Sequence, residues 1–301
     1  MVRVRAFLAA VAMVPSLASA ATPIHLAPST PWVLDYAENS CRLLRRFGQG
    51  NDSTTLAFES EAPDSLDLLI IGQPLKTGRD EVAVKFLPSR STAMIGRVDE
   101  TREGKVPSVL VNGVQLVSDD FVAAAKKRRS GLKVNADTMR FEEKAAYRAE
   151  RGAFAANTTA VEIDARRNSP VVLDTGSLGQ AIKSFDQCSR DSLRDWGVDP
   201  DLEDRIVKPA RSDVRQWFSP DDYPKDMLAQ GQESVVKVRV LVDATGRVTK
   251  CTTISHFNAP EFDRITCAKF VQRVHFKPAE LADGTKVPSY YVNKVIFRIG
   301  F

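Results

Sequence analysis

The residue types best suited to chemistry stand in one short run, Val171 to Ser177, where an apolar stretch is followed by Asp174, Thr175 and Gly176. An aspartate at the end of a strand could act as a general base on a water molecule. That chemistry needs a second aspartate to share the proton, so that one carboxyl acts as base while the other acts as acid. The chain holds one Asp-Thr-Gly run and no Asp-Ser-Gly run. A homodimer would therefore have to supply the second carboxyl.

This run resembles the apolar-apolar-Asp-Thr-Gly-Ser signature of aspartic proteases. A protease lobe also needs a flap hairpin and further strands after the signature, whereas a helical stretch carrying Cys188 follows here at once. The simpler interpretation is a strand that ends at Asp174, with a glycine turn leading into a helix. An aspartic-protease-like enzyme that uses Asp174 is the remote alternative. We predict no catalytic residue and no enzyme.

Other catalytic and metal-binding patterns are missing from the sequence. It contains no G-x-S-x-G elbow, P-loop, G-x-G-x-x-G or H-E-x-x-H motif, and each of these is needed for a particular chemistry. The three histidines, His25, His256 and His275, are scattered, and no two cysteines have C-x-x-C spacing. A structural metal site needs such clustering. We therefore expect neither a metal nor a cofactor.

The N-terminus has the features of a secretory signal peptide. Arg3 and Arg5 precede an apolar run that ends before Pro15, and small residues lead up to Ala20. This order predicts cleavage after Ala20 and export to the periplasm. The alternative is an uncleaved inner-membrane anchor, but a spanning helix needs about 20 apolar residues and this run is shorter. We expect a soluble mature chain without a retained membrane anchor.

The cysteine count suits an exported protein. Cys41, Cys188, Cys251 and Cys267 are an even set, and in an oxidising compartment such a set predicts two disulfides. Four cysteines allow three pairings. The first two cysteines lie in the longer N-terminal part and the last two in the C-terminal part, so we expect pairs within each part, Cys41 with Cys188 and Cys251 with Cys267.

The charge balance argues against nucleic acid as a partner. Without Arg3 and Arg5 the mature chain would carry 40 basic and 38 acidic side chains, a net charge of only +2. Residues 209–301 hold 14 Lys and Arg and 10 Asp and Glu, whereas residues 21–208 hold 26 and 28. The C-terminal part, at +4, favours acidic partners slightly over the rest of the chain, at −2.

Short apolar runs between turn residues predict strands through most of residues 31–113. The predicted elements that follow are a helix starting at Ser118, a second helix at Thr138 to Arg151, strands at Thr159 to Ile163 and Pro170 to Leu173, and a helix from Leu178 to Trp196. Together these predict a mixed domain of helices and strands over residues 21–200. The stretch 197–222 is polar, has three prolines and shows no sustained period. A linker is therefore predicted at residues 201–212.

The C-terminal residues have a clear order of elements. The pattern predicts a short helix at Pro224 to Gln230, strands at Ser234 to Val242 and Arg247 to Ser255, a helix at Pro260 to Arg273, and a last strand at Ser289 to Ile299. The first two strands are joined through Asp-Ala-Thr-Gly, which predicts a hairpin with a positive φ at Gly246. Pro260 is compatible with the first turn of its helix.

Several of these C-terminal segments together resemble the C-terminal domain of TonB. The matching segments are Tyr223-Pro224, Ala229 and Gly231, VVKVRVLVDATGRV, EFDRITCAKFVQRV, Phe276-Lys277-Pro278-Ala279, Asp283-Gly284 and the final KVIFRI. Each is weak alone, but their order and spacing are specific. The resemblance covers most of residues 213–301. It implies a small α+β domain with a three-stranded antiparallel sheet and two helices, so the expected fold class is α+β throughout.

The resemblance also implies a partner. In that family the domain contacts outer-membrane TonB-dependent transporters, whose extended segment adds to the sheet beside the last strand. The matching positions here are Tyr223, Pro224, Tyr290, Lys294 and Arg298. The chain departs from the family's energy transducers because it has a cleavable signal instead of a membrane anchor and no proline-rich spacer. The alternatives left open are binding to another envelope protein and a structural, peptidoglycan-associated role without transport.

Overall fold

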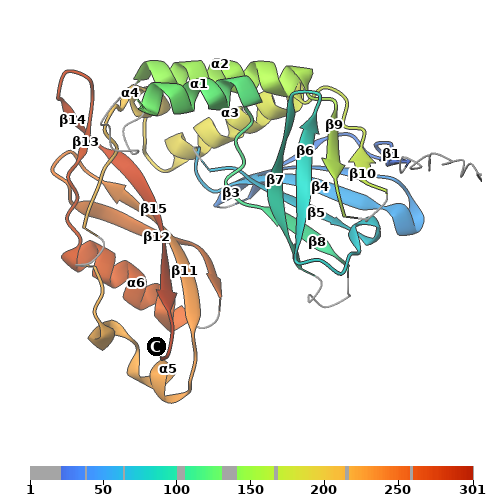
Figure 1. The fold of residues 1–301 in the computed structure, drawn as a ribbon. Coiled ribbons are helices and arrows are strands. Elements are labelled where there is room, and N and C mark those ends of the chain that lie inside the picture. The colour runs from blue at the N-terminus through green and yellow to red at the C-terminus, as the bar shows by residue number, and fades with distance from the viewer. Residues whose placement is uncertain are drawn as a thin grey trace, which may run out of the picture.

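The computed structural model describes residues 22–37, 39–63, 65–99, 106–130, 141–165, 169–213, 217–257 and 260–300. The predicted signal peptide and its cleavage residue, Ala20, lie outside these residues. Figure 1 shows a strand-rich body with helices along one side and a smaller body built around α6 and three strands. We refer to residues 22–205 as the N-terminal unit and to residues 206–300 as the C-terminal unit. No helix among the described residues is long and apolar enough to cross a membrane.

The N-terminal unit contains a ten-stranded sheet. Its strands are β1 (Ile24–Leu26), β2 (Val33–Ala37), β3 (Ser40–Phe47), β4 (Thr54–Ser60), β5 (Asp67–Gly72), β6 (Glu81–Leu87), β7 (Arg90–Asp99), β8 (Ser108–Val111), β9 (Ala160–Ile163) and β10 (Val171–Leu173). Its helices are α1 (Asp119–Ser130), α2 (Phe141–Asn157), α3 (Gly179–Asp195) and α4 (Pro200–Arg205), with the 3-10 turns η1 (Gly50–Asp52) and η2 (Gln73–Leu75).

The strands run in the order β1-β10-β9-β6-β7-β8-β5-β4-β3-β2. Among the described strands of this sheet, β1 and β10 form a parallel pair and all other pairs are antiparallel. Burial alternates along β5 and β6, as expected for strands with one face in a core. Pro28, just after β1, forms an isolated bridge with Phe47 at the end of β3. The sheet therefore curls until its β1 end meets β3, near the opposite end of the strand order.

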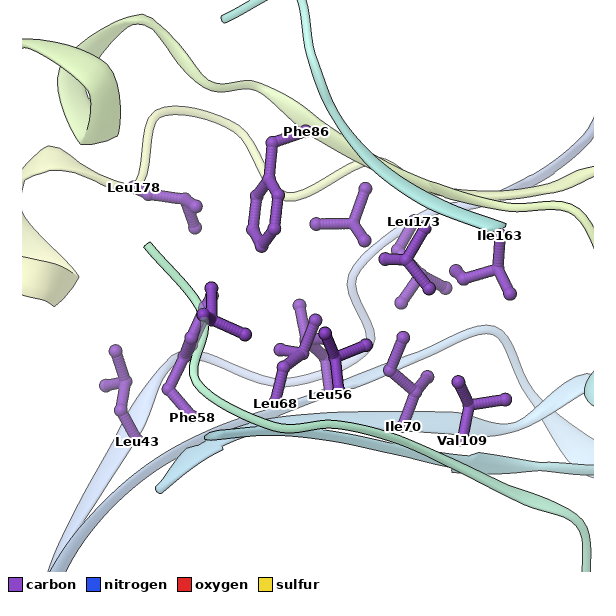
Figure 2. Packing of buried hydrophobic residues seen from close by; sticks show 14 of the residues in the cluster. Leu43, Leu56, Phe58, Leu68, Ile70, Phe86, Val109, Ile163, Leu173 and Leu178 are labelled. Carbon is purple, nitrogen blue, oxygen red and sulfur yellow. The ribbon is translucent and has the colours of Figure 1, made fainter. Parts of the chain in front are cut away.

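The core of this unit lies between the two halves of the curled sheet. Figure 2 shows side chains from β6, β9 and β10 facing those from β3, β4, β5 and β8. Helix α3 closes one end through the buried Ile182, Phe185 and Cys188. A disulfide joins Cys188 to Cys41 on β3, with an S–S distance of 1.97 Å. This is one of the two pairs expected from the sequence, and it ties the end helix to the sheet.

The C-terminal unit has a three-stranded antiparallel sheet and helices on one side. Its elements are η4 (Pro220–Asp222), α5 (Lys225–Ala229), β11 (Ser234–Val242), β12 (Val248–Phe257), α6 (Pro260–Arg273), β13 (Ala279–Glu280), β14 (Lys286–Val287) and β15 (Ser289–Phe297). The strand order is β12-β11-β15. The sheet and helices match the fold expected for this part of the chain.

Four valines on β11 form the centre of the second core. Val236, Val238, Val240 and Val242 are all buried, and α6 packs on β11 and β12. Phe262 and Phe270 of α6 join the same cluster. The second disulfide, Cys251 to Cys267, links β12 to α6 with an S–S distance of 1.99 Å, as the sequence predicted.

The predicted linker, residues 201–212, is anchored along its length. It contains most of α4, which is held to the N-terminal unit by ion pairs such as Arg190 with Asp204, at 2.7 Å. Ile206 is buried in a small cluster with the β13–β14 hairpin, and Leu202 packs against it. Lys208 then bridges to Glu280. The chain passes from one unit to the other through a packed contact.

The predicted elements and the observed ones differ in a few places. Helix α2 runs to Asn157, past the predicted end at Arg151, because Phe154 and Ala155 are buried in the core. Strand β15 ends at Phe297, two residues before the predicted end at Ile299, which is 37% exposed. Its backbone N–H donates to the carboxylate of Glu233 at 2.9 Å, outside the sheet.

We predict that Gly246→Ala destabilises the C-terminal unit by about 2 kcal/mol or more, through strain and clash together. Gly246 has φ of +90°, and an added Cβ would lie 1.9 Å from the carbonyl oxygen of Phe276. Gly284→Ala is the matched control, since φ there is +85° but nothing lies within 4 Å. Urea unfolding followed by circular dichroism measures both. Equal losses in the two variants would contradict a role for the close approach.

Candidate functional site

The edge of the C-terminal sheet at β15 is open in the part of the chain that the structure describes. β15 pairs with β11 along its whole length, from Ser289 opposite Val242 to Phe297 opposite Ser234. In the strand order it is the last strand on its side. Successive residues of a strand direct their N–H and C=O groups to opposite sides. Every second residue of β15 therefore presents its main chain away from β11.

The two faces of β15 have different surroundings. Tyr291, Val295 and Phe297 face the core, where Tyr291 lies 5.1 Å from Phe276 between ring centres. On the other face, Lys294 is exposed. Tyr290 instead packs edge-on against Trp196 of the N-terminal unit, at 5.7 Å.

Arg298 follows the last residue of β15 and is exposed. Of the five positions that the family resemblance indicates, Tyr290, Lys294 and Arg298 thus lie on or just beyond the same strand. Of these three, Tyr290 contacts the N-terminal unit through Trp196.

Tyr223 and Pro224 lie at the end of β15. The Tyr223 ring is 5.6 Å from Phe297 and 5.7 Å from Phe262, edge-on to both. Its hydroxyl donates to the carbonyl oxygen of Gln232 at 2.5 Å. Burial raises the pKa of Tyr223, so this hydroxyl stays a donor at neutral pH. Pro224 is buried at the start of α5. Both residues support the end of the sheet.

Asp222 anchors this segment to α6. Its carboxylate accepts hydrogen bonds from the backbone N–H and hydroxyl of Ser219 and forms ion pairs with Lys269 at 2.7 Å and Arg273 at 2.8 Å. Burial by itself would raise the pKa of Asp222, but the hydrogen bonds and the two positive charges outweigh it and hold the pKa below the usual value of an aspartate. Our sequence reasoning missed this residue. The Ser219-x-x-Asp222 spacing of a capping box was the available signal.

A shallow cleft of about 410 Å³ adjoins this anchor. It is lined by Asp221 to Asp226, Glu261, Ile265 and Lys269. Among the described residues, no group of three or more His, Cys, Asp or Glu is arranged to hold a metal ion.

Asp174, the residue considered for catalysis, lies far from this site. It directly follows β10, and its carboxylate is 3.0 Å from Nδ1 of His25 on β1. The partner of this carboxylate is thus a histidine and not a second carboxyl. The next residue, Thr175, is buried, and its carbonyl oxygen accepts a hydrogen bond from Arg45. β10 ends just before Asp174, Gly176 has a positive φ of 61°, and α3 begins at Gly179. This is the strand, glycine turn and helix that the simpler interpretation predicted.

The three tryptophans are not gathered into a stacking platform. Trp32 packs on the N-terminal core, Trp217 is buried in the C-terminal core, and Trp196 lies against Tyr290.

We expect Asp222→Asn to lower the free energy of unfolding by about 2 to 3 kcal/mol at neutral pH, because it removes charged hydrogen bonds. A carboxyl with a lowered folded pKa stabilises the fold above its unfolded pKa, and the contribution is lost as pH falls through the folded pKa. The parent should therefore lose more stability than the variant on acidification. Urea unfolding at neutral and acidic pH measures this, with exposed Asp221→Asn as control. Identical pH dependence in parent and Asp222→Asn would refute it.

Comparison with known proteins agrees with this geometry. No curated protein matches the chain. Residues 219–299 match the model of the family described as Gram-negative bacterial TonB protein C-terminal. That family is a protein-interaction domain of cell-envelope proteins linked to TonB-dependent transport. The matched residues run from Ser219, beside the Asp222 anchor, to the end of β15 and include the whole three-stranded sheet. Residues 219–299 of this chain are thus a TonB C-terminal domain.

Proposed function

We propose that this protein is an exported, periplasmic binding protein whose C-terminal domain binds an extended segment of an outer-membrane transporter by strand addition at β15. The observation that carries the proposal is the unpaired outer edge of β15 among the described strands, in a domain assigned to a family that contacts such transporters. The proposal divides the chain into two domains, with the connection near residues 201–212.

Strand addition places few demands on side chains. The added segment would form main-chain hydrogen bonds with the outward N–H and C=O groups of β15, and its alternate side chains would meet the two faces of the sheet. On the outer face it would lie beside Lys294 and Ile296, which is 48% exposed. Tyr223 would limit the edge at its far end, where its ring packs edge-on against Phe297, and the buried Pro224 follows it in the chain. These are the contacts from which side-chain preference would arise.

Export fits the cysteine chemistry. Both disulfides join elements that are distant along the chain or across the core, Cys41 to Cys188 and Cys251 to Cys267. Disulfides persist in the periplasm and are rare in the reducing cytosol. The proposed signal peptide, cleaved after Ala20, would deliver the chain to that compartment.

The N-terminal unit has no enzymatic role in this proposal. Asp174 is paired with His25 on the edge of the sheet, where the pair links β1 to β10. A single carboxyl cannot share a proton in the way that acid and base catalysis by an aspartyl pair requires. We propose instead that this unit determines how the C-terminal sheet is presented to its partner.

A pull-down from solubilised envelope with the mature protein as bait tests the function. The proposal predicts recovery of outer-membrane transporters. Recovery of peptidoglycan without any transporter would contradict it and favour the structural role.

Proline substitutions at β15 test the binding edge. Val292 and Asn293 are successive residues paired with Arg239 and Val238, so only one of them directs its N–H away from β11. We compare Val292→Pro with Asn293→Pro. The substitution at the residue whose N–H points away from β11 should leave the protein folded, because it keeps every hydrogen bond to β11. We expect it to lose transporter recovery in the pull-down. Circular dichroism identifies the folded variant.

Thr252→Pro and Thr253→Pro are the matched controls, since these residues pair with the same two positions of β11 from the opposite edge, β12. The folded member of this pair should recover transporters as the parent does. Full recovery by the folded β15 variant would show that strand addition at β15 is wrong.

A further inference from the structure

The N-terminal unit covers one end of the outer face of the C-terminal sheet. On β11 this face carries Val235, Lys237 and Arg239, which alternate with the buried valines. Val235 is 37% exposed, whereas Arg239 is only 5% exposed. The covering group is Trp196, which follows α3: the guanidinium carbon of Arg239 lies 3.6 Å from the centre of the indole ring. Tyr290 on β15 meets the same indole edge-on at 5.7 Å.

Two further contacts join the units at this place. Nη2 of Arg239 donates to the side-chain oxygen of Asn39, in the turn between β2 and β3, at 3.4 Å. Lys237 forms an ion pair with Glu61, just after β4. We call these six residues the clamp: Asn39, Glu61 and Trp196 of the N-terminal unit with Lys237, Arg239 and Tyr290 of the C-terminal unit.

The N-terminal half of the clamp is held together by a disulfide. Asn39 lies two residues before Cys41, and Trp196 lies at the end of the helix that carries Cys188. The Cys41–Cys188 bond therefore fixes the turn and the helix relative to each other. The N-terminal half of the clamp therefore meets the C-terminal sheet as one rigid surface.

The contact between Arg239 and Trp196 holds the two units together only modestly. Arg239 is buried. Among the residues that the structure describes, its partners are an aromatic ring and an amide oxygen, and its Nη1 has no hydrogen-bond partner. Burial lowers the pKa of Arg239 to about 10, so the group is still charged at neutral pH. The cost of desolvating a cation that no carboxylate compensates offsets much of the attraction to the ring. Breaking such a contact therefore costs little free energy.

Charge supplies the rest of the attraction. Lys237 stands directly opposite Lys294 in the sheet, and like charges in that position repel. Glu61 relieves this repulsion when the units are docked. The contact therefore depends on ionic strength, because salt screens partly exposed charges.

We propose that the N-terminal unit is a releasable cover of the C-terminal sheet, with Trp196 on Arg239 as its latch. The pivot is the small cluster of Ile206 and Leu202 with the β13–β14 hairpin. Release uncovers Lys237, Arg239 and Tyr290 beside the exposed Lys294, on the side of β15 that the partner would meet. Only this last consequence rests on the proposed function. An acidic segment of the partner would compete with Glu61 for the same face.

Lysine modification measures the cover directly in the full mature chain. The acetylation rate of Lys237 reports whether the N-terminal unit covers it. The exposed Lys250 on β12 is the internal reference. In Trp196→Ala we expect the acetylation rate of Lys237 relative to Lys250 to rise about threefold or more, because the latch is lost. The ion-pair partner of Lys237 is Glu61, which the substitution leaves in place, so the rise would report release of the whole surface. Val271→Ala, at a 52% exposed position of α6, should leave the rate unchanged.

A charge swap provides the second test. Glu61→Lys should separate the units and increase the maximum dimension in small-angle X-ray scattering, and adding Lys237→Glu should restore the compact form. The cover is refuted if folded Trp196→Ala leaves the Lys237 rate at the parent value, or if Glu61→Lys scatters like the parent.

The same variants in the envelope pull-down separate the two proposals. Greater transporter recovery by Trp196→Ala than by the parent supports the cover as a brake on binding. If Lys237 is released but no variant recovers a transporter, the cover stands and the proposed function fails. If transporters are recovered while Lys237 stays protected in Trp196→Ala, the proposed function stands and the cover fails.

Discussion

Val236, Val238, Val240 and Val242 take alternate positions of the central strand β11, and all four are buried on the side that faces α6. Side chains in a strand alternate between the two faces, so Lys237 and Arg239 must point to the opposite side. A slip of one residue would bury the charges and expose the valines, which fixes the register. The register in turn places Arg239 on the face that Trp196 covers. The covered face is thus a consequence of this one apolar row.

The sequence predicted the elements whose own residues carry the pattern. β11 and α6 were found with the predicted bounds, because alternating valines define the strand and Pro260 begins the helix. β1 was missed because its three residues pair with β10, far away along the chain. The β13–β14 hairpin was missed because each strand has only two residues. Pairing between distant segments leaves no local signal.

The residues of the candidate site also fall into a group that was predictable from the sequence and a group that was not. The strand that carries Tyr290 and Lys294 was predictable from its alternation and from the resemblance to the TonB C-terminal domain. Contacts that depend on the other unit were not, since nothing near Trp196 in the sequence indicates that its indole meets Arg239. Asp222 was an intermediate case, because the spacing to Ser219 is local while Lys269 and Arg273 come from α6. The match to the family covers residues 219–299, so the N-terminal unit has to be understood from its own contacts.

The most direct measurement of the open edge is residue-resolved amide hydrogen exchange along β15, in the free protein and with solubilised outer-membrane transporters. The account predicts alternation in the free protein: amides directed to β11 exchange slowly, and those directed away from it exchange fast. With transporters present, the fast set alone should become slow, because an added strand pairs with it. Slow exchange at every β15 amide in the free protein, or no change in the fast set when transporters bind, would contradict strand addition at this edge.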